Sequence, residues 1–258
     1  MGVGNQWVIN GTLVASVALL SSTGVAQKAA SPVALPLDAI IQSTEKAQAT
    51  ASPQVSYQVI REYRLSGAKD SEANSRVVAE VNFKPPASEG YRIARYSGSS
   101  RGQQLVRSVL DHEVEVTSEN NKERSAISRD NYTFSYSGEA SLDGQSCYVL
   151  GLKPKRTDKD LISGQVWVDK HSFLIRQIQG DAAKTPSWWL KKVHITLVFA
   201  DREGSWVQKS MEAIADVRIV GTHTLTSRIL DYRRESEVAA TPFPAGSVLP
   251  APAPQSAR

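Results

Sequence analysis

Ser100 is the residue whose spacing best matches a catalytic motif. It lies in the tract GSSRG at 98–102, which fits the G-x-S-x-G nucleophile elbow and follows an expected strand and precedes an expected helix, as that motif requires. The α/β-hydrolase fold needs a parallel sheet, however, and the chain after Glu113 is typical of antiparallel strands. No Gly-rich oxyanion loop precedes the serine, and the four histidines have no context that marks a triad partner. A flexible Gly/Ser loop is therefore favoured, and a serine hydrolase using Ser100 remains a second alternative.

The histidines and the single cysteine also suggest no other chemistry. His112 stands between Asp111 and Glu113, but the sequence lacks ligand spacings such as H-E-x-x-H or paired C-x-x-C, so we expect no metal site. No dinucleotide fingerprint or phosphate-binding glycine loop is present, and we expect no cofactor. Cys147 cannot form an internal disulfide, and its surroundings favour a small buried apolar side chain over an activated thiol. The sequence therefore predicts a protein that is not an enzyme.

The stretch 164–233 contains consecutive strands joined by short polar turns. In the segment 193–199 every odd position is apolar, which is the period-2 signature of a half-buried strand. A polar turn at 201–205 leads to a second run at 206–211, and another break precedes the run 224–232. Strands joined by loops this short pair antiparallel, because a parallel partner needs a crossover of a dozen or more residues.

Earlier segments add strands and helices to this meander. Alternation predicts strands in the runs 55–65, 76–83, 91–96, 131–136 and 147–152, and in the first of them only Arg61 interrupts the apolar face. Apolar spacing predicts helices over 37–50 and 103–113. The segment 119–129 is polar, and we expect a mobile loop there.

Composition describes an ordinary globular protein of 258 residues, 41% hydrophobic and 22% charged, which is enough for one large β domain or two small ones. The net charge of +4 is spread along the chain among acidic residues, which argues against nucleic acid as a partner. Residues 1–26 carry no charge and contain a short apolar run, so we expect a signal peptide despite the missing basic residue. A leader at 27–36, a domain at 37–233 and a disordered Ala/Pro-rich tail at 234–258 follow.

Three tracts resemble a known family: YVLGLKP at 148–154, VWVDK at 166–170 and FLIR at 173–176. They are similar to the outer-membrane lipoprotein-sorting family, which is LolA/LolB-like and related in fold to the sigma-regulator RseB. The resemblance implies an α+β, mainly antiparallel fold: a curved, unclosed β-barrel with helices covering its open concave side. It also implies a periplasmic carrier or chaperone whose partners are the acyl chains of lipids or lipoproteins. The chain lacks a lipobox cysteine, which argues against the membrane-anchored acceptor of that family.

Alternating strand faces nominate ten residues for the wall of such an apolar cavity, with ordinary core packing as the other interpretation: Val59, Tyr63, Val81, Phe83, Phe134, Val166, Val168, Ile195, Leu197 and Phe199. The adjacent Trp188 and Trp189 cannot both face inward on a strand, so one of them is a candidate contact to a partner or to the lid. The alternative function is an envelope-stress sensor or scaffold of the same fold that contacts envelope membrane proteins.

Overall fold

The structure, a computed structural model, describes residues 35–51, 55–67, 74–86, 88–185, 187–188, 190–218 and 221–234. The described residues form ten strands and three helices: α1 (Leu37–Thr50), β1 (Tyr57–Gly67), β2 (Ser75–Lys84), β3 (Ser88–Gly98), α2 (Ser100–Thr117), α3 (Glu119–Ser125), β4 (Tyr132–Leu142), β5 (Gln145–Pro154), β6 (Ile162–Asp169), β7 (Ile175–Ala182), β8 (Leu190–Arg202), β9 (Ser205–Val217) and β10 (Gly221–Arg234). Across these ranges, none of the helices has the length and apolar character needed to cross a membrane.

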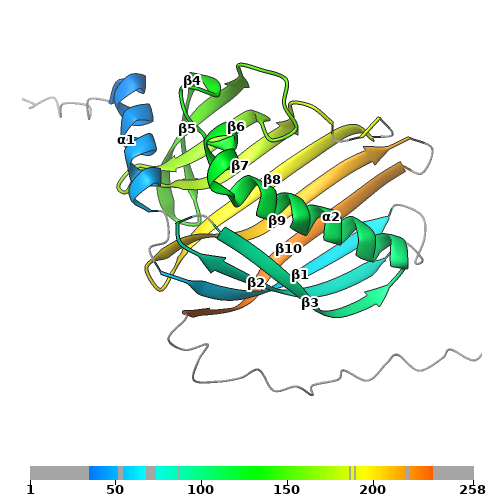
Figure 1. Cartoon of the computed structure of the whole chain (residues 1–258). Coiled ribbons are helices and arrows are strands. Elements are labelled where there is room, and N and C mark those ends of the chain that lie inside the picture. Colours follow the sequence, from blue (N-terminus) through cyan, green and yellow to red (C-terminus); the bar gives the residue numbers. More distant parts are fainter. Residues whose placement is uncertain are drawn as a thin grey trace, which may run out of the picture. The chain divides into compact units, whose positions relative to one another are not determined.

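All ten strands belong to one antiparallel sheet in the order β3-β2-β1-β10-β9-β8-β7-β6-β5-β4. Each strand from β4 to β10 pairs with its neighbour in sequence, and β1 pairs with β10, which joins the N-terminal strands to the meander (Figure 1). The sheet does not close, because β3 and β4 remain its two edges. The predicted fold class, a curved and unclosed antiparallel barrel with few helices, is confirmed.

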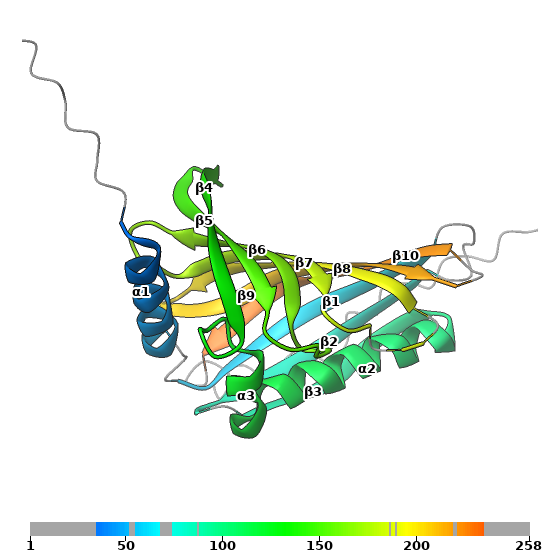
Figure 2. The same ribbon diagram turned by 90° about the horizontal axis from the view of Figure 1, so that it is seen from above.

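The two longer helices lie on the same side of this sheet (Figure 2). Ser99 caps α2, since its hydroxyl accepts a hydrogen bond from the Gly102 N–H, and Val106 and Leu110 bury the inner stripe of the helix. In α1 the residues Ile40 and Ile41 are buried in the same way. Both helices extend over the predicted segments, and α2 is longer than predicted at each end.

One prediction of secondary structure is wrong. The segment 119–129 was expected to be a mobile loop, and the structure has the short helix α3 at Glu119–Ser125. The helix follows α2 after a single residue. The Asn131 side-chain amide donates hydrogen bonds to two carbonyls at the C-terminal end of α3, those of Glu123 and Ala126. A polar sequence without apolar periodicity does not signal such a helix, because its stabilising contacts come from elsewhere in the chain.

Several predictions fall outside the described residues. The signal peptide at 1–26, most of the leader at 27–36, Trp189 and nearly all of the tail at 234–258 lie there. They stay predictions.

The turn between β6 and β7 is organised by the buried carboxylate of Asp169. Its side chain accepts hydrogen bonds from the backbone N–H groups of His171 and Ser172 and from the Arg176 guanidinium. Burial opposes ionisation, but the hydrogen bonds, led by the one from Ser172, dominate and lower the pKa of Asp169 from 3.8 to about 2. The ionised side chain therefore holds the turn together.

We expect Asp169→Asn to lower the free energy of unfolding by about 2 kcal/mol at pH 7. Because the folded pKa lies below the unfolded value, this contribution is fully present above about pH 4 and is lost as the pH falls towards 2. Urea denaturation at pH 7, 4, 3 and 2 measures it. The exposed Asp130→Asn makes the same change of charge and should shift stability little at any of these pH values. Equal losses in the two variants would contradict the assignment.

Candidate functional site

The helix-bearing face of the sheet carries two separate clusters of buried apolar side chains. The first, here the α1 cluster, gathers Ile40 and Ile41 with residues of the strands from β4 to β7: Tyr132, Tyr148, Leu150, Leu152, Val166, Val168, Ile175 and Ile178. The second, the α2 cluster, gathers Val106 and Leu110 with residues of β1, β2 and β10: Val59, Tyr63, Leu65, Val77, Ala79, Val81 and Leu225. Each helix therefore packs over one half of the same face of the sheet. The strands between the two halves, β8 and β9, contribute no buried residue to either cluster.

Two rows of side chains cross this face through all ten strands, since directly paired residues share a face of a sheet. The first row runs from β4 to β3 as Tyr136, Leu150, Val166, Ile178, Leu197, Met211, Ser227, Tyr63, Val77 and Tyr96. The second runs as Phe134, Leu152, Gly164, Gly180, Ile195, Ala213, Leu225, Leu65, Ser75 and Gly98. The register thus brings residues from both ends of the chain into one apolar surface.

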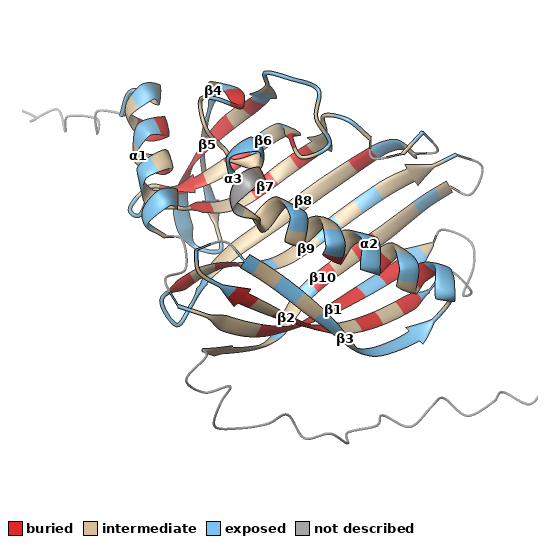
Figure 3. Ribbon diagram, viewed as in Figure 1, coloured by how far each residue is buried: buried red, intermediate tan, exposed pale blue. Residues whose placement is uncertain are grey.

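The middle of both rows is only half-buried. On β8 and β9 the half-buried residues of the rows are Ile195, Leu197, Met211 and Ala213, and together with Phe199, which follows Leu197 on the same face of β8, they are called here the central strip. Figure 3 shows the same two strands mostly at intermediate burial, between the buried positions of their neighbours. Leu197 and Phe199 pack beside the α1 cluster, Met211 and Ala213 beside the α2 cluster, and Ile195 belongs to neither. The strip is therefore apolar surface that the fold leaves unfilled between two cores.

The ten residues nominated from the sequence all lie on this helix-bearing face. Six of them are buried: Val59, Tyr63, Val81, Phe83, Val166 and Val168. The other four are half-buried: Phe134, Ile195, Leu197 and Phe199. The buried six pack as core in this structure, so their part in a cavity wall stays a prediction, and three of the remaining four belong to the central strip.

A polar cluster interrupts the α2 cluster, and the sequence analysis did not identify it as a site. Arg61 of β1 faces the helices, and its Nη1 lies 3.2 Å from Glu113 Oε2 on α2. The Tyr63 hydroxyl donates to the same oxygen at 2.8 Å, and Arg61 Nη2 donates to the Gln208 carbonyl at 2.9 Å. Ser227, the pairing partner of Tyr63, completes the group, called here the polar cluster. One signal was present: Arg61 is in phase with the apolar positions 59, 63 and 65.

Glu89 of β3 places a second carboxylate near the polar cluster. It accepts a hydrogen bond from the Thr117 hydroxyl of α2 at 2.9 Å. Burial raises the pKa of Glu89, and the neighbouring charge of Glu113 raises it further. The Arg61 guanidinium therefore has Glu113 as its direct partner and lies near a second carboxylate, Glu89, which is easier to protonate than usual.

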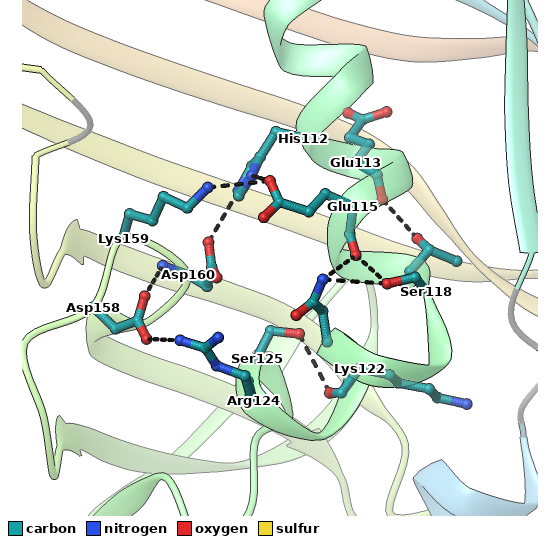
Figure 4. A network of polar contacts seen from close by, with 12 residues as sticks. His112, Glu113, Glu115, Ser118, Lys122, Arg124, Ser125, Asp158, Lys159 and Asp160 are labelled. Carbon is teal, nitrogen blue, oxygen red and sulfur yellow. Dashed lines mark hydrogen bonds and ion pairs between the residues drawn. The ribbon is translucent and has the colours of Figure 1, made fainter.

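Polar contacts tie the far end of α2 to the connection between β5 and β6 (Figure 4). Lys159 Nζ lies 3.1 Å from Glu115 Oε2, and His112 Nε2 lies 3.4 Å from Asp160 Oδ1. Arg124 of α3 pairs with Asp158 at 3.2 Å. Most of these side chains are half-exposed, so each pair contributes little to stability. Together they fasten the C-terminal end of α2, and α3 after it, to the connection between β5 and β6.

Ser100 lies at the start of α2, between strand and helix as its motif requires, but in an antiparallel sheet. It is exposed, and Ser99 is the residue that caps the helix. The histidines have other partners: His112 pairs with Asp160 and Glu115, and His194 with Asp181 and Gln179. In hydrolases the nucleophile elbow connects a strand of a parallel sheet to a helix, whereas the strand before Ser100 belongs to an antiparallel sheet.

Trp188, in the connection between β7 and β8, is 84% exposed. Its backbone carbonyl accepts a hydrogen bond from Arg218 Nε at 3.1 Å, so the main chain is held while the indole projects outward. Exposed tryptophan at a loop is typical of a contact with a partner or a lipid interface.

We expect Trp188→Ser to leave the midpoint of thermal unfolding within about 1 °C of the native value, because exposed side chains contribute little to stability. Differential scanning calorimetry checks this. Trp206→Ser is the contrasting variant, since the Trp206 indole N–H donates to the Ile175 carbonyl, and it should lower the midpoint by several degrees. A large loss for Trp188→Ser would assign that side chain to the core.

No family model matches the chain, and no curated protein does. Solved structures resemble it at low identity. A putative outer membrane lipoprotein-sorting protein domain from Vibrio parahaemolyticus is 14% identical with a TM-score of 0.40, over 76% of this chain and 92% of that chain. A DUF1329 family protein from Desulfovibrio piger is 14% identical with a TM-score of 0.41, over 78% and 93%. A LolA superfamily protein from Nitrosomonas europaea is 14% identical with a TM-score of 0.38, over 78% and 94%. The resemblance stated from the sequence is confirmed as a likeness to these structures.

Proposed function

We propose that this chain is an exported binding protein that holds the acyl chains of lipids or lipoproteins against the central strip. The observation that carries the proposal is the half-burial of the strip between two cores that do not merge. A protein without a ligand gains by burying such a surface in one continuous core. Leaving it half-covered costs about 25 cal/mol for each Å² of apolar area left in water.

An acyl chain suits this surface chemically. The strip residues Ile195, Leu197, Phe199, Met211 and Ala213 offer methyl, thioether and ring surface without a hydrogen-bonding group. A peptide laid there would leave its backbone N–H and C=O groups unpaired, whereas each CH₂ of an acyl chain gains about 0.8 kcal/mol on burial. The Met211 side chain is flexible, which helps such a wall to accept chains of different shape.

Export across the inner membrane, cleavage before Gln27 and action in the periplasm belong to the same proposal. They rest on the uncharged, partly apolar segment 1–26 of the sequence. A carrier that shuttles lipids between membranes would need to be released in this way.

Lipid extraction tests the proposal. The full chain is produced with its N-terminal segment and purified without detergent, and its organic extract is examined by mass spectrometry. Lipid-free protein is then titrated with 1,6-diphenylhexatriene, whose fluorescence rises in apolar surroundings. We expect stoichiometric acyl lipid in the extract and saturable probe binding in the micromolar range. A chain that yields no lipid and leaves the probe dark contradicts the proposed function.

The exposed indole of Trp188 favours a second candidate, a scaffold or sensor that contacts another envelope protein. Crosslinking in envelope extracts separates it from the first. A single stoichiometric protein partner, lost on Trp188→Ser and found without bound lipid, would favour the scaffold.

A further inference from the structure

Buried polar atoms without partners gather in the polar cluster. Among the residues that the structure describes, six buried side-chain nitrogen or oxygen atoms have no hydrogen-bond partner. Four of the six belong to this cluster: Arg61 Nε, Glu113 Oε1, Gln208 Nε2 and Ser227 Oγ. A buried polar group without a partner destabilises the folded state, so four in one cluster demand an explanation.

The four atoms come from different elements that converge beneath α2. Arg61 on β1 contacts both Glu113 on α2 and the main chain of Gln208 on β9. Ser227 on β10 is paired with Tyr63, whose hydroxyl donates to Glu113. The Arg61 side chain is 9% exposed and Ser227 is 2% exposed. The sheet therefore presents a group of polar atoms on an otherwise apolar floor.

The polar cluster adjoins the central strip directly. Ser227 is the pairing partner of Met211, which pairs in turn with Leu197. Gln208 pairs with Phe199, another residue of the strip. A molecule with its apolar part on the strip would therefore bring its polar end to Gln208 and Ser227.

The atoms select for the kind of polar end. Arg61 Nε–H and Gln208 Nε2–H are donors that need an acceptor, Glu113 Oε1 is an acceptor that needs a donor, and the Ser227 hydroxyl can be either. An ammonium ion offers no acceptor. A carboxylate or phosphate offers no donor for Glu113 Oε1, and Arg61, the cation that would attract such an anion, is already paired with Glu113 at 3.2 Å.

We propose that the polar cluster is a subsite for the uncharged polar end of an amphiphile, a group with both a carbonyl or hydroxyl acceptor and a free O–H or N–H donor. A glyceryl ester with free hydroxyls and a fatty-acid amide share this chemistry. The inference rests on the proposed function, since the acyl part of the same molecule occupies the central strip. Beyond that function, the inference specifies the class of lipid that the site prefers.

Competition against diphenylhexatriene tests this inference. Lipid-free full chain is loaded with the probe, which has no polar end, and is titrated with monooleoylglycerol, methyl oleate and oleate. These ligands share one acyl chain and differ only in offering an acceptor with donors, an acceptor alone, and an anion. We expect monooleoylglycerol to bind about tenfold more tightly than the other two.

Two variants locate the selectivity. Gln208→Leu and Ser227→Ala should each weaken monooleoylglycerol about fivefold, and leave diphenylhexatriene and methyl oleate unchanged. Ser210→Ala is the control: it lies on β9 opposite Arg228, on the face away from the helices, and it should change no affinity. A purely structural role for Gln208 or Ser227 would lower the unfolding midpoint and leave the ratio of affinities as it was.

The outcomes separate the two proposals. Equal binding of the three oleoyl ligands, tighter binding of oleate, or an unchanged ratio in both variants overturns the polar subsite while the acyl-binding function stands. Failure of the wild-type chain to bind diphenylhexatriene or any oleoyl ligand overturns the proposed function, and the subsite falls with it.

Discussion

Replacing Ile195 with glutamate should weaken binding of an apolar ligand at least tenfold. Ile195 stands at the centre of the central strip and packs in neither cluster, so its side chain faces the proposed ligand directly. A carboxylate there would have to lose its water when the acyl chain binds, which costs several kcal/mol without a cationic partner. Titration of the lipid-free variant with diphenylhexatriene measures the loss.

Ile214→Glu provides the matched control. Ile214 directly follows Ala213 of the strip, so it lies on the opposite face of β9, where it pairs with His194, and it is 36% exposed. The same substitution there should leave probe affinity within twofold, because water still reaches the carboxylate. Ile195→Asn is measured alongside, so that a neutral polar side chain is available if the charged variant is unstable. Equal affinities for Ile195→Glu, Ile195→Asn and the wild type would remove the strip from the binding site.

Local alternation was sufficient to predict most strands but not their partners. The odd apolar positions of 193–199 place β8 correctly and separate its two faces. Alternation cannot tell which face meets a helix, because that depends on residues far away in the chain. The pairing of β1 with β10, which joins residues 57–67 to residues 223–234, is such a long-range fact. The resemblance to the lipoprotein-sorting family predicted the open barrel. Only the strand register of the structure shows which residues line up in the two rows across the helix-bearing face.

The sequence could not predict which apolar residues are buried in the core and which form the candidate binding surface, for a related reason. Val166 and Leu197 are both apolar and both lie in the first row, yet one is buried and the other is half-buried. The difference is that α1 packs over the strands of Val166 and that no cluster closes over β8. Burial of this kind is set by where helices lie, which period-2 patterns do not encode.

Arg61 illustrates what an exception in a pattern can mean. A charged residue in phase with buried neighbours is costly unless it is paired, and the structure pairs it with Glu113 on a helix 52 positions away in sequence. The sequence marked the position as an interruption and could not supply the partner. Broken alternation in a strand of a binding fold is therefore a useful place to look for polar recognition.

The second large effect is expected at two glycines that face each other in the second row. Gly164 on β6 and Gly180 on β7 are direct partners, beside Ile195. A Cβ on Gly180 would lie 2.3 Å from the Ser163 carbonyl oxygen and 2.7 Å from the Gly164 Cα, and both of these atoms belong to the main chain. Glycine is found where strands bend tightly or approach closely, as at the corners of barrels.

We expect Gly180→Ala to lower the free energy of unfolding by about 3 kcal/mol, because neither contacting atom can move without shifting a strand. Gly90→Ala is the control, since a Cβ on Gly90 of the edge strand β3 has nothing within 4 Å, and it should be neutral within about 0.5 kcal/mol. Urea denaturation compares the two. A tolerated alanine at 180 would mean that β6 and β7 can separate at low cost. In that case the close approach of these strands, which sets the α1 cluster beside the central strip, would not be what shapes this side of the sheet.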